Sequence, residues 1–260
     1  MASPQTRVLV TGGSGFLGSH IVQQLLDDST TSVAVVSRNP KNATSGNSNE
    51  RLSYHHADVT SETDMQALFD KVKPDAVIHT ASPRYTDHAA AQVHTNIDGT
   101  RTLLKVASAA NTQAFIYTSS DSAVYPTQEP LTEDKAELYT EQEYANPYGM
   151  SKAVADAAVQ KANSAQLKTA VIRLPGIYGE NDNNFVPQLL ASVWKKEHKM
   201  QVGKDTKLFE FVYVKKAAEA HILAMRALLD PQRASKVSGE AFFVSDGVSE
   251  PMFHFSRRFW

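Results

Sequence analysis

The feature that most constrains the fold is a glycine-rich turn, TGGSGFLG, at residues 11–18. The apolar run at 7–11 before it is typical of a buried strand, and the amphipathic pattern after it is typical of a helix. Glycines spaced three residues apart let a pyrophosphate approach the backbone and the N-terminus of that helix. The turn therefore predicts a dinucleotide site, with contacts from Gly12, Gly15, Phe16, Leu17 and Gly18.

Length and composition narrow the class of protein. The 260 residues suffice for one large α/β domain, and a net charge of −2 gives no electrostatic reason to expect a nucleic-acid partner. Cysteine is absent, which excludes disulfides, thiolate nucleophiles and cysteine-ligated metals. No stretch is apolar enough to span a membrane, and the histidines and acids lack metal-ligand spacing. We therefore predict no transmembrane segment and no metal.

Apolar runs alternate with helical patterns along most of the chain. Strands separated by helices pair in parallel through right-handed crossovers, which predicts a doubly wound Rossmann sheet with its ligand beyond the carboxyl ends of the strands. We predict one domain over 1–260, with a small substrate lobe drawn mainly from 180–210 and 240–260. The expected strands are 7–11, 32–36, 52–55, 76–80, 114–119 and 169–173, and the expected helices are 14–26, 62–73, 93–110, 147–165, 185–196 and 215–229.

The end of the second strand bears on which dinucleotide is bound. Where NAD-binding folds commonly place an acid for the adenosine ribose, this chain has Ser37 followed by Arg38. A guanidinium pairs bidentately with a 2′-phosphate, so we favour NADP(H), while NAD(H) stays open, as does a solvated loop role for Arg38. After the third strand, Asp58 and Val59 are expected to flank the adenine, although Asp58 also suits a helix-approach cap.

Tyr148 and Lys152 lie four residues apart in the predicted helix 147–165, so they share one helix face. A free phenol has a pKa of about 10, and a nearby ammonium, helped by an oxidised nicotinamide, favours the phenolate and lowers that pKa. Tyr148 is then suited to exchange a proton with an alcohol or a ketone. The strand 114–119 runs into Ser119 and Ser120, which places hydroxyls at the same sheet edge to hydrogen-bond a reacting oxygen.

Several segments in chain order resemble the extended short-chain dehydrogenase/reductase superfamily, and within it the 3β-hydroxysteroid dehydrogenase (sterol 3-dehydrogenase) branch. The HTAS and YTSS forms are what separate this branch from the sugar-nucleotide epimerases. The likeness covers essentially the whole chain. The matching segments are 11–18, VIHTAS at 77–82, TNIDGT at 95–100, FIYTSS at 115–120, YGMSK at 148–152, RLPGIYG at 173–179 and FVYV at 211–214.

This resemblance implies a role for each matching residue. Tyr148 is implied as the acid/base, and Lys152 as its electrostatic partner and a ribose ligand. Ser120 is implied as the group that orients the carbonyl, with Ser119 in its place if the strand register is shifted by one. Asn96 matches the family's helix-kink asparagine, which supports a proton relay. The residues implied to line the cofactor cleft are Ala81, Ser82, Pro175 and Ile177.

Two departures from the family pattern matter. Many members carry an acid where this chain has the pair Ser37 and Arg38. Members also commonly continue well past a segment like 250–260, so we expect a shortened substrate lobe that ends in an amphipathic helix. Its apolar side chains are then expected to form an exposed patch, although an ordinary docked terminal helix stays open. The patch comprises Phe253, Phe255, Phe259 and Trp260.

We predict an oxidoreductase that uses NADP(H) or NAD(H) to interconvert a secondary alcohol and a ketone. The expected substrate is apolar and polycyclic: a sterol, a steroid or a terpenoid-type secondary metabolite. Two alternatives stay open: a sugar-nucleotide epimerase or dehydratase of the same superfamily, and a non-catalytic dinucleotide-sensing protein. We also expect a homodimer through 93–110 and 147–165, and a cytoplasmic location, with attachment to the periphery of an intracellular membrane left open.

Overall fold

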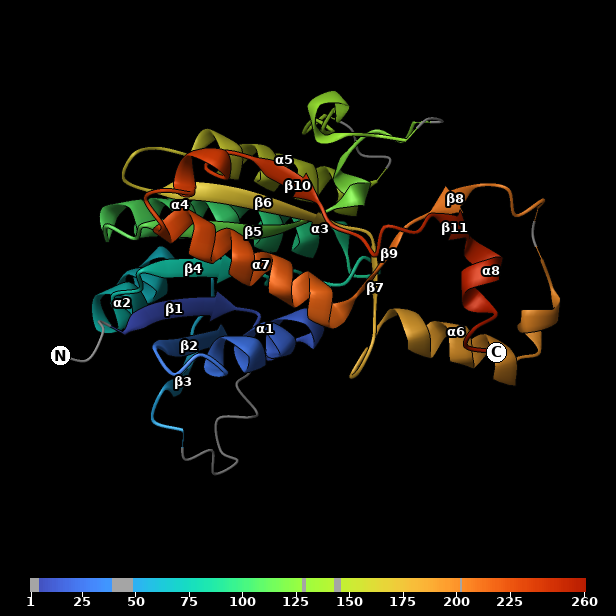
Figure 1. Cartoon of the computed structure of the whole chain (residues 1–260), viewed down its shortest axis with the longest axis horizontal. Helices are drawn as coiled ribbons and strands as arrows, with labels where there is room; N and C mark the ends of the chain where they lie inside the picture. The colour runs from blue at the N-terminus through green and yellow to red at the C-terminus, as the bar shows by residue number, and fades with distance from the viewer. Residues whose placement is uncertain (1–4, 39–48, 128–129, 143–145, 202) are drawn as a thin grey trace.

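Seven parallel strands form one central sheet, in the order β10-β6-β5-β4-β1-β2-β3 (Figure 1). The computed structural model describes residues 5–38, 49–127, 130–142, 146–201 and 203–260. The doubly wound sheet is confirmed, and each strand expected before Arg173 is within one residue of its predicted ends. The strands are β1 (Thr6–Thr11), β2 (Thr31–Ser37), β3 (Leu52–His56), β4 (Ala76–His79), β5 (Ala114–Ser120), β6 (Lys168–Leu174) and β10 (Ala241–Phe243).

Helices cover both faces of this sheet (Figure 1). One face packs against α1 and α7, and the other against α2, α4 and α5. The strand order reverses between the neighbouring strands β1 and β4. Open α/β sheets bind their ligands at such a reversal. The helices are α1 (Phe16–Leu26), α2 (Glu62–Val72), α4 (Gly99–Ala109), α5 (Pro147–Lys161) and α7 (Val214–Leu229), and the 3-10 turns are η3 (Asp121–Ala123), η4 (Glu133–Lys135), η5 (Glu197–Lys199) and η6 (Ala234–Lys236).

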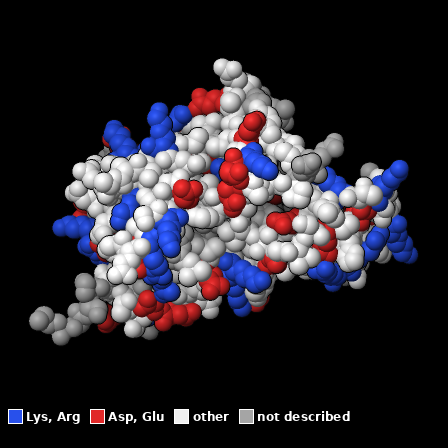
Figure 2. Space-filling view, turned by 45° about the horizontal axis from the view of Figure 1, so that its top comes forward, with Lys and Arg blue, Asp and Glu red and all other residues white. Residues whose placement is uncertain are grey.

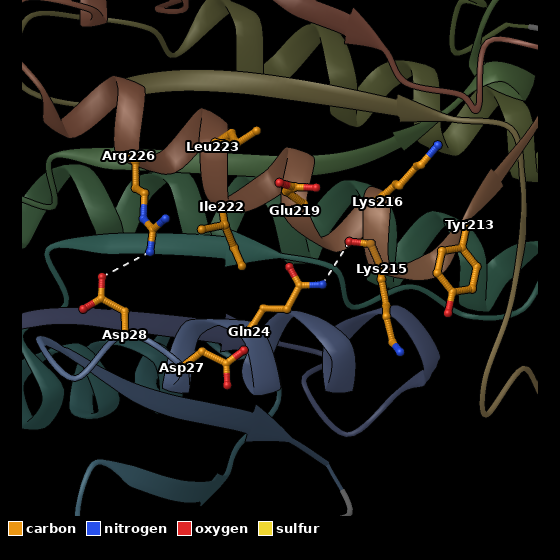
Figure 3. A pocket seen from close by; sticks show the side chains of 10 residues that line it. All are labelled: Gln24, Asp27, Asp28, Tyr213, Lys215, Lys216, Glu219, Ile222, Leu223 and Arg226. Carbon is orange, nitrogen blue, oxygen red and sulfur yellow. Dashed lines mark hydrogen bonds and ion pairs between the residues drawn. The ribbon is translucent and has the colours of Figure 1, made fainter.

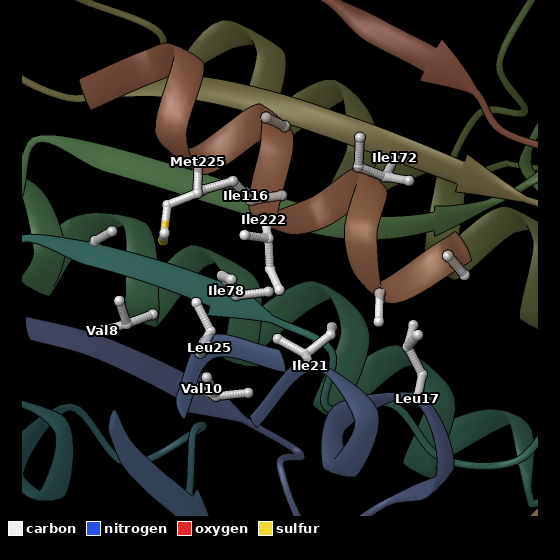
Figure 4. Packing of buried hydrophobic residues seen from close by; sticks show 14 of the residues in the cluster. Val8, Val10, Leu17, Ile21, Leu25, Ile78, Ile116, Ile172, Ile222 and Met225 are labelled. Atoms are coloured by element: carbon white, nitrogen blue, oxygen red, sulfur yellow. The ribbon is translucent and has the colours of Figure 1, made fainter. Parts of the chain in front are cut away.

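Figure 4 shows the apolar layer between the sheet and the pair α1 and α7. Val8 and Val10 of β1 point into this layer, while Leu9 points into the layer on the opposite face. Side chains alternate along a strand, so a strand covered on both faces is apolar at every position. Ile21 of α1 and Ile222 of α7 are buried in the same layer. Each such side chain stabilises the fold by roughly 1.5–3 kcal/mol relative to exposure.

The helix predicted over 93–110 is interrupted. It consists of α3 (Ala89–Gln92), a π-helical turn η2 (Val93–Asp98) and α4. The Gly99 N–H donates to the carbonyl of His94, five residues earlier, which widens the turn. The apolar period of the sequence continues through this region, so it did not signal the insertion. Such π-turns occur frequently at functional sites, and this one contains Asn96.

Shorter elements form a smaller body at one end of the sheet, on the right of Figure 1. In the sequence they follow β6, where the alternation of strands and helices loosens. This is the region from which the substrate lobe was expected, and the division into domains stays a prediction. The pairs are β7 (Gly176–Tyr178) with β9 (Phe211–Tyr213), parallel, and β8 (Leu208–Phe209) with β11 (Glu250–Pro251), antiparallel; the helices are α6 (Phe185–Trp194) and α8 (Met252–Ser256).

The expected exposed patch of aromatic residues at 253–260 is wrong. Phe255 is only 2% exposed, and its ring stacks on Phe211 with 3.6 Å between the centroids. Phe259 packs on Phe255, and the indole N–H of Trp260 donates to the carbonyl of Leu189 at 3.2 Å. Stacking within the lobe therefore buries Phe255 and leaves Phe253, Phe259 and Trp260 half-buried, as in a docked terminal helix. Among the described residues, no helix combines the length and the apolar character needed to cross a membrane.

Candidate active site

The turn between β1 and α1 brings backbone segments together so closely that side chains do not fit. Gly12 has a φ of +69°, and a Cβ there would lie 2.8 Å from the Ala81 nitrogen. A Cβ on Gly18 would lie 2.2 Å from the Gly12 carbonyl oxygen. Gly15 is the N-cap of α1 and provides no side-chain cap. The result is a tight turn without side chains at its glycines, at a helix N-terminus, which fits the pyrophosphate of a dinucleotide.

Ser14, inside the glycine turn, was not among the predicted site residues. Its hydroxyl is buried and has no hydrogen-bond partner among the described residues. A buried polar atom without a partner is costly and needs an explanation. A hydroxyl beside the cradle fits a phosphate oxygen as acceptor. The glycine spacing alone did not signal it, because the fingerprint leaves this position unspecified.

The end of β4 lies directly against this turn. The Ala81 N–H donates to Thr11 Oγ1 at 3.2 Å, and Thr80 Oγ1 donates to the Thr11 carbonyl at 2.7 Å. Ala81 is half-buried there, as expected for a residue that lines the cradle. Ser82 follows on the surface, where its hydroxyl donates to the carbonyl of Pro83.

The residues expected near the adenosine lie at the ends of β2 and β3. Ser37 is half-buried and Arg38 is exposed. Partial burial raises the pKa of Asp58, but hydrogen bonds from Thr60 and the positive charge of Arg38 outweigh it, so the pKa is lowered. Asp58, after β3, and Arg38, after β2, are thus close enough to interact, so the ends of these two strands lie near each other. Val59 is buried, with its side chain under Gly99 at the start of α4.

The helix α5 carries Tyr148 and Lys152 on one face, as the spacing predicted. The Asn146 side chain caps this helix by accepting from the Gly149 N–H at 3.0 Å. Lys152 is 2% exposed, and its ammonium donates to the carbonyl of Thr118 in β5 at 2.5 Å. Burial lowers the pKa of Lys152 to about 7, although the charge of Asp156 opposes this shift.

Asp156, one turn after Lys152, belongs to a buried ion pair. Arg173 of β6 donates to its carboxylate through Nε at 2.9 Å and through a second guanidinium nitrogen at 3.2 Å. The two side chains are 0% and 3% exposed. The guanidinium also lies 5.4 Å from the ring centroid of Phe243 in β10. The pair joins α5 to the sheet and keeps a negative charge beside the lysine.

The Tyr148 phenol meets the hydroxyl that ends β5. Desolvation raises the pKa of Tyr148 to about 12, and the charge of Asp121 adds to the increase, while a hydrogen bond with Ser120 opposes it. The predicted lowering of this pKa requires an oxidised nicotinamide beside the Lys152 ammonium, whereas the protein groups without a cofactor raise it. The chain by itself therefore favours the neutral phenol, which is the form that donates a proton.

Ser120, rather than Ser119, is the hydroxyl that influences the pKa of Tyr148. The hydroxyl of Ser120 also donates to Asp121 Oδ1 at 3.2 Å and accepts from the Ser122 N–H at 3.1 Å. Ser119 points elsewhere, and its buried hydroxyl has no partner in the described parts of the chain. Asp121 was not predicted as a site residue. Asp121 is exposed as a residue, but the protein around its carboxylate partly desolvates it and raises its pKa, against hydrogen bonds from Ser120 and Ser122.

The remaining predicted residues lie around this group. Asn96, in η2, donates through Nδ2 to the hydroxyl of Ser151 at 2.9 Å, which places it against α5. Pro175 is half-buried between β6 and β7. Ile177 packs against the apolar layer of α1 and α7, as an ordinary core residue does.

A groove of about 720 Å³ between α1 and α7 is separate from this site (Figure 3). None of the predicted site residues lines it. Its charged side chains are largely engaged: Arg226 pairs with Asp28 at 3.1 Å and Lys215 with Glu180 at 2.9 Å. The groove therefore adds nothing to the chemistry of the sheet edge.

The cradle, the parallel sheet and the group of Tyr148, Lys152 and Ser120 define an NAD(P)-dependent short-chain dehydrogenase/reductase that acts on CH–OH groups. The chain belongs to the 3-beta hydroxysteroid dehydrogenase/isomerase family, whose sequence model matches residues 9–260. The predicted family and enzyme class are confirmed. The residue roles stay predictions.

Three relatives illustrate the similarity. A decarboxylating sterol-4-alpha-carboxylate 3-dehydrogenase of Gibberella zeae is 51% identical over 206 residues, which is 78% of this chain and 68% of the relative. The enzyme of the same name from Schizosaccharomyces pombe is 32% identical over 257 residues, 99% of this chain and 74% of the relative. A 3 beta-hydroxysteroid dehydrogenase/Delta 5-->4-isomerase of Mycobacterium tuberculosis is 31% identical over 260 residues, which is 96% of this chain and 68% of the relative.

Solved structures share the fold at low identity. The UDP-glucose 4-epimerase of Thermotoga maritima superposes with a TM-score of 0.75 at 23% identity, covering 97% of this chain and 82% of that one. The Bordetella bronchiseptica enzyme WbmG, in complex with NAD, superposes with a TM-score of 0.76 at 20% identity, covering 99% of this chain and 78% of that one. At these identities the likeness shows the fold alone.

One buried histidine behind the site predicts acid sensitivity. His221 of α7 is 0% exposed, with Nε2 2.8 Å from Thr118 Oγ1 and Nδ1 2.7 Å from the Ala217 carbonyl. Burial lowers its pKa to about 4, against the hydrogen bond to Ala217. As the pH is lowered from about 6.5 to about 4, only the unfolded chain takes up this proton. The free energy of unfolding therefore falls by about 3 kcal/mol over this range.

We expect His221→Gln, which keeps a partner for Thr118, to show a shallower loss of unfolding free energy between about pH 6.5 and pH 4. Urea unfolding at several pH values measures it. The exposed His88→Gln is the matched control and should follow the wild type. Equal slopes for wild type and His221→Gln would contradict the assignment.

Proposed function

We propose that this chain oxidises a secondary hydroxyl on an apolar polycyclic substrate of the sterol type to a ketone, or reduces that ketone. The observation that carries the proposal is the buried Lys152, one helical turn from Tyr148, whose ammonium donates to the Thr118 carbonyl of β5 at the same sheet edge as the glycine cradle. The names of the Gibberella and Schizosaccharomyces relatives support a sterol 4α-carboxylate as the substrate class. The neighbouring epimerases support only the fold, so a sugar-nucleotide activity is not proposed.

The residues divide the work of proton transfer. A nicotinamide cofactor held at the glycine cradle would supply or accept the hydride at the carbon that bears the oxygen. Ser120 holds that oxygen by a hydrogen bond, and Tyr148 donates a proton to it during reduction or removes one during oxidation. Lys152, fixed by the Thr118 carbonyl, provides the positive charge that favours the phenolate when oxidation requires a base.

Oxidation of a 4α-carboxylated sterol would have a second consequence. The product is a β-keto acid, and such acids lose carbon dioxide when the bond to the carboxyl carbon breaks. The electron pair of that bond passes into the enolate of the ketone, which then takes up one proton at carbon to give the neutral ketone. No further oxidant is needed, which agrees with the word decarboxylating in the relatives' names.

Replacing the phenol tests the catalytic assignment. Tyr148→Phe should lower kcat by about 10²–10⁴-fold on a 3β-hydroxy-4α-carboxysterol, because the proton donor is lost. The cofactor affinity, measured by fluorescence quenching, should stay within about twofold, since the cradle lies on other elements. Tyr54→Phe, in β3 and outside the site, is the control. A non-catalytic dinucleotide sensor would show no turnover even in the wild type.

We favour NADP(H) as the cofactor because of Arg38. It follows β2 and is exposed, so its guanidinium is accessible to a 2′-phosphate. Arg38→Ala should weaken NADPH binding by roughly tenfold and leave NADH binding unchanged, because only NADPH carries that phosphate. Thermal melting with NADPH, with NADH and with neither measures the effect. Greater stabilisation of the wild type by NADH would overturn the preference.

We also propose a homodimer through 93–110 and 147–165. Small exposed side chains, Ala109 on α4 and Ala157 on α5, support close approach of a second copy. Ala157→Arg should then shift the protein to monomers in sedimentation experiments, and a wild type that is monomeric at micromolar concentration would remove the idea.

Two expectations about partners and place stay predictions. The face in Figure 2 carries Lys and Arg interspersed with Asp and Glu, which supports the expectation of no nucleic-acid partner. The cytoplasmic location, with peripheral attachment to an intracellular membrane as the open option, stays a prediction as well.

A further inference from the structure

A buried histidine that the proposed mechanism does not use lies at the centre of the site. His79 is the last residue of β4 and is 0% exposed, between β1 and β5 in the sheet. Its Nδ1 lies 2.6 Å from Thr11 Oγ1, beside the glycine turn. Its Nε2 lies 3.1 Å from Thr100 Oγ1, at the start of α4. One ring therefore connects the cofactor turn to the helix that follows Asn96.

The neighbouring groups fix the direction of every hydrogen bond in this chain. Thr100 Oγ1 donates to the Asn96 carbonyl at 2.5 Å, so it must accept from His79 Nε2–H. The neutral ring then has a bare Nδ1, which accepts from the Thr11 hydroxyl. Thr11 Oγ1 in turn accepts from the Ala81 N–H. Burial lowers the pKa of His79 to about 3, which agrees with a neutral ring.

The chain of hydrogen bonds continues to the helix that carries the phenol. Asn96 Nδ2 donates to Ser151 Oγ at 2.9 Å, and Ser151 Oγ donates to the Tyr148 carbonyl at 2.9 Å. Asn96, Thr100 and Ser151 are all nearly or fully buried, so water does not compete for these bonds. These bonds, with the covalent link inside Asn96 between its backbone carbonyl and its side chain, connect Ala81 at the cradle to the backbone carbonyl of Tyr148 in α5.

We propose that His79 is a positioning residue, which holds the cofactor cradle and the Tyr148 helix at a fixed distance through Thr11 on one side and Thr100, Asn96 and Ser151 on the other. The proposal rests on the proposed role of Tyr148 as the acid/base. Proton transfer depends steeply on placement, so loosening this path should reduce turnover without removing any group that contacts the substrate.

The test compares two fully buried threonines, one on the hydrogen-bond path and one off it. Thr100→Val removes the hydroxyl at nearly constant volume and should lower kcat about tenfold and weaken NADPH binding about threefold, while Thr100→Ser restores both. Thr169→Val is the control, because Thr169 is equally buried and its hydroxyl donates to the Val159 carbonyl, off the path. Ser151→Ala breaks the path near Tyr148 and provides a second variant if Thr100→Val fails to fold.

Two further readouts separate positioning from general stability. Thr11→Val combined with Thr100→Val should cost less in kcat than the product of the single effects, because both act through one ring. Long-range ¹H–¹⁵N correlation NMR of the unliganded wild type should show His79 with its proton on Nε2. Additive effects, an Nδ1–H ring, or an equal loss in Thr169→Val would overturn the proposal. A wild type without sterol turnover would instead contradict the proposed function. The NMR and cofactor-binding results would still test the positioning role of His79.

Discussion

The close backbone approach around Gly12 is the constraint on which the rest of the site depends. A side chain at Gly12 would collide with Ala81, and one at Gly18 would collide with Gly12, so β1, α1 and the end of β4 are held at contact distance. The parallel pairing of β1 with β4 fixes the same neighbours. Because β4 also pairs with β5, the position of the cradle sets the position of Ser120 and, through Thr118, of Lys152.

Polar groups are buried at this sheet edge in unusual density, and each needs its partner. Lys152 loses water and gains the Thr118 carbonyl, while His221 receives a hydrogen bond from the Thr118 hydroxyl and donates to Ala217. An unpaired buried donor or acceptor costs about 1–3 kcal/mol. Breaking one of these bonds leaves its buried partner unpaired, which links the geometry near the reacting oxygen to the packing behind it.

The sequence predicted the parts of the fold that follow from periodicity and from glycine geometry. Both the strands and the cradle depend on local patterns. The apolar residues Val8 to Val10 were therefore sufficient to predict β1, and the three glycines were sufficient to predict the cradle. The π-helical turn was missed because the apolar pattern of 93–110 reads through it. Phe255 was misplaced because its burial depends on Phe211, far away in sequence, and Asp121 was missed because its environment is created by Tyr148 on another helix.

The buried pair of Asp156 and Arg173 restricts how this chain can change over evolutionary time. Removing either partner leaves a lone charge inside the protein, at a cost of about 3–5 kcal/mol, which is a large share of the margin that keeps a typical domain folded. Replacing both with apolar residues of similar volume is far cheaper. Descendants can therefore lose the pair only by a route whose first step is close to unfolding, so these two positions are expected to be inherited together.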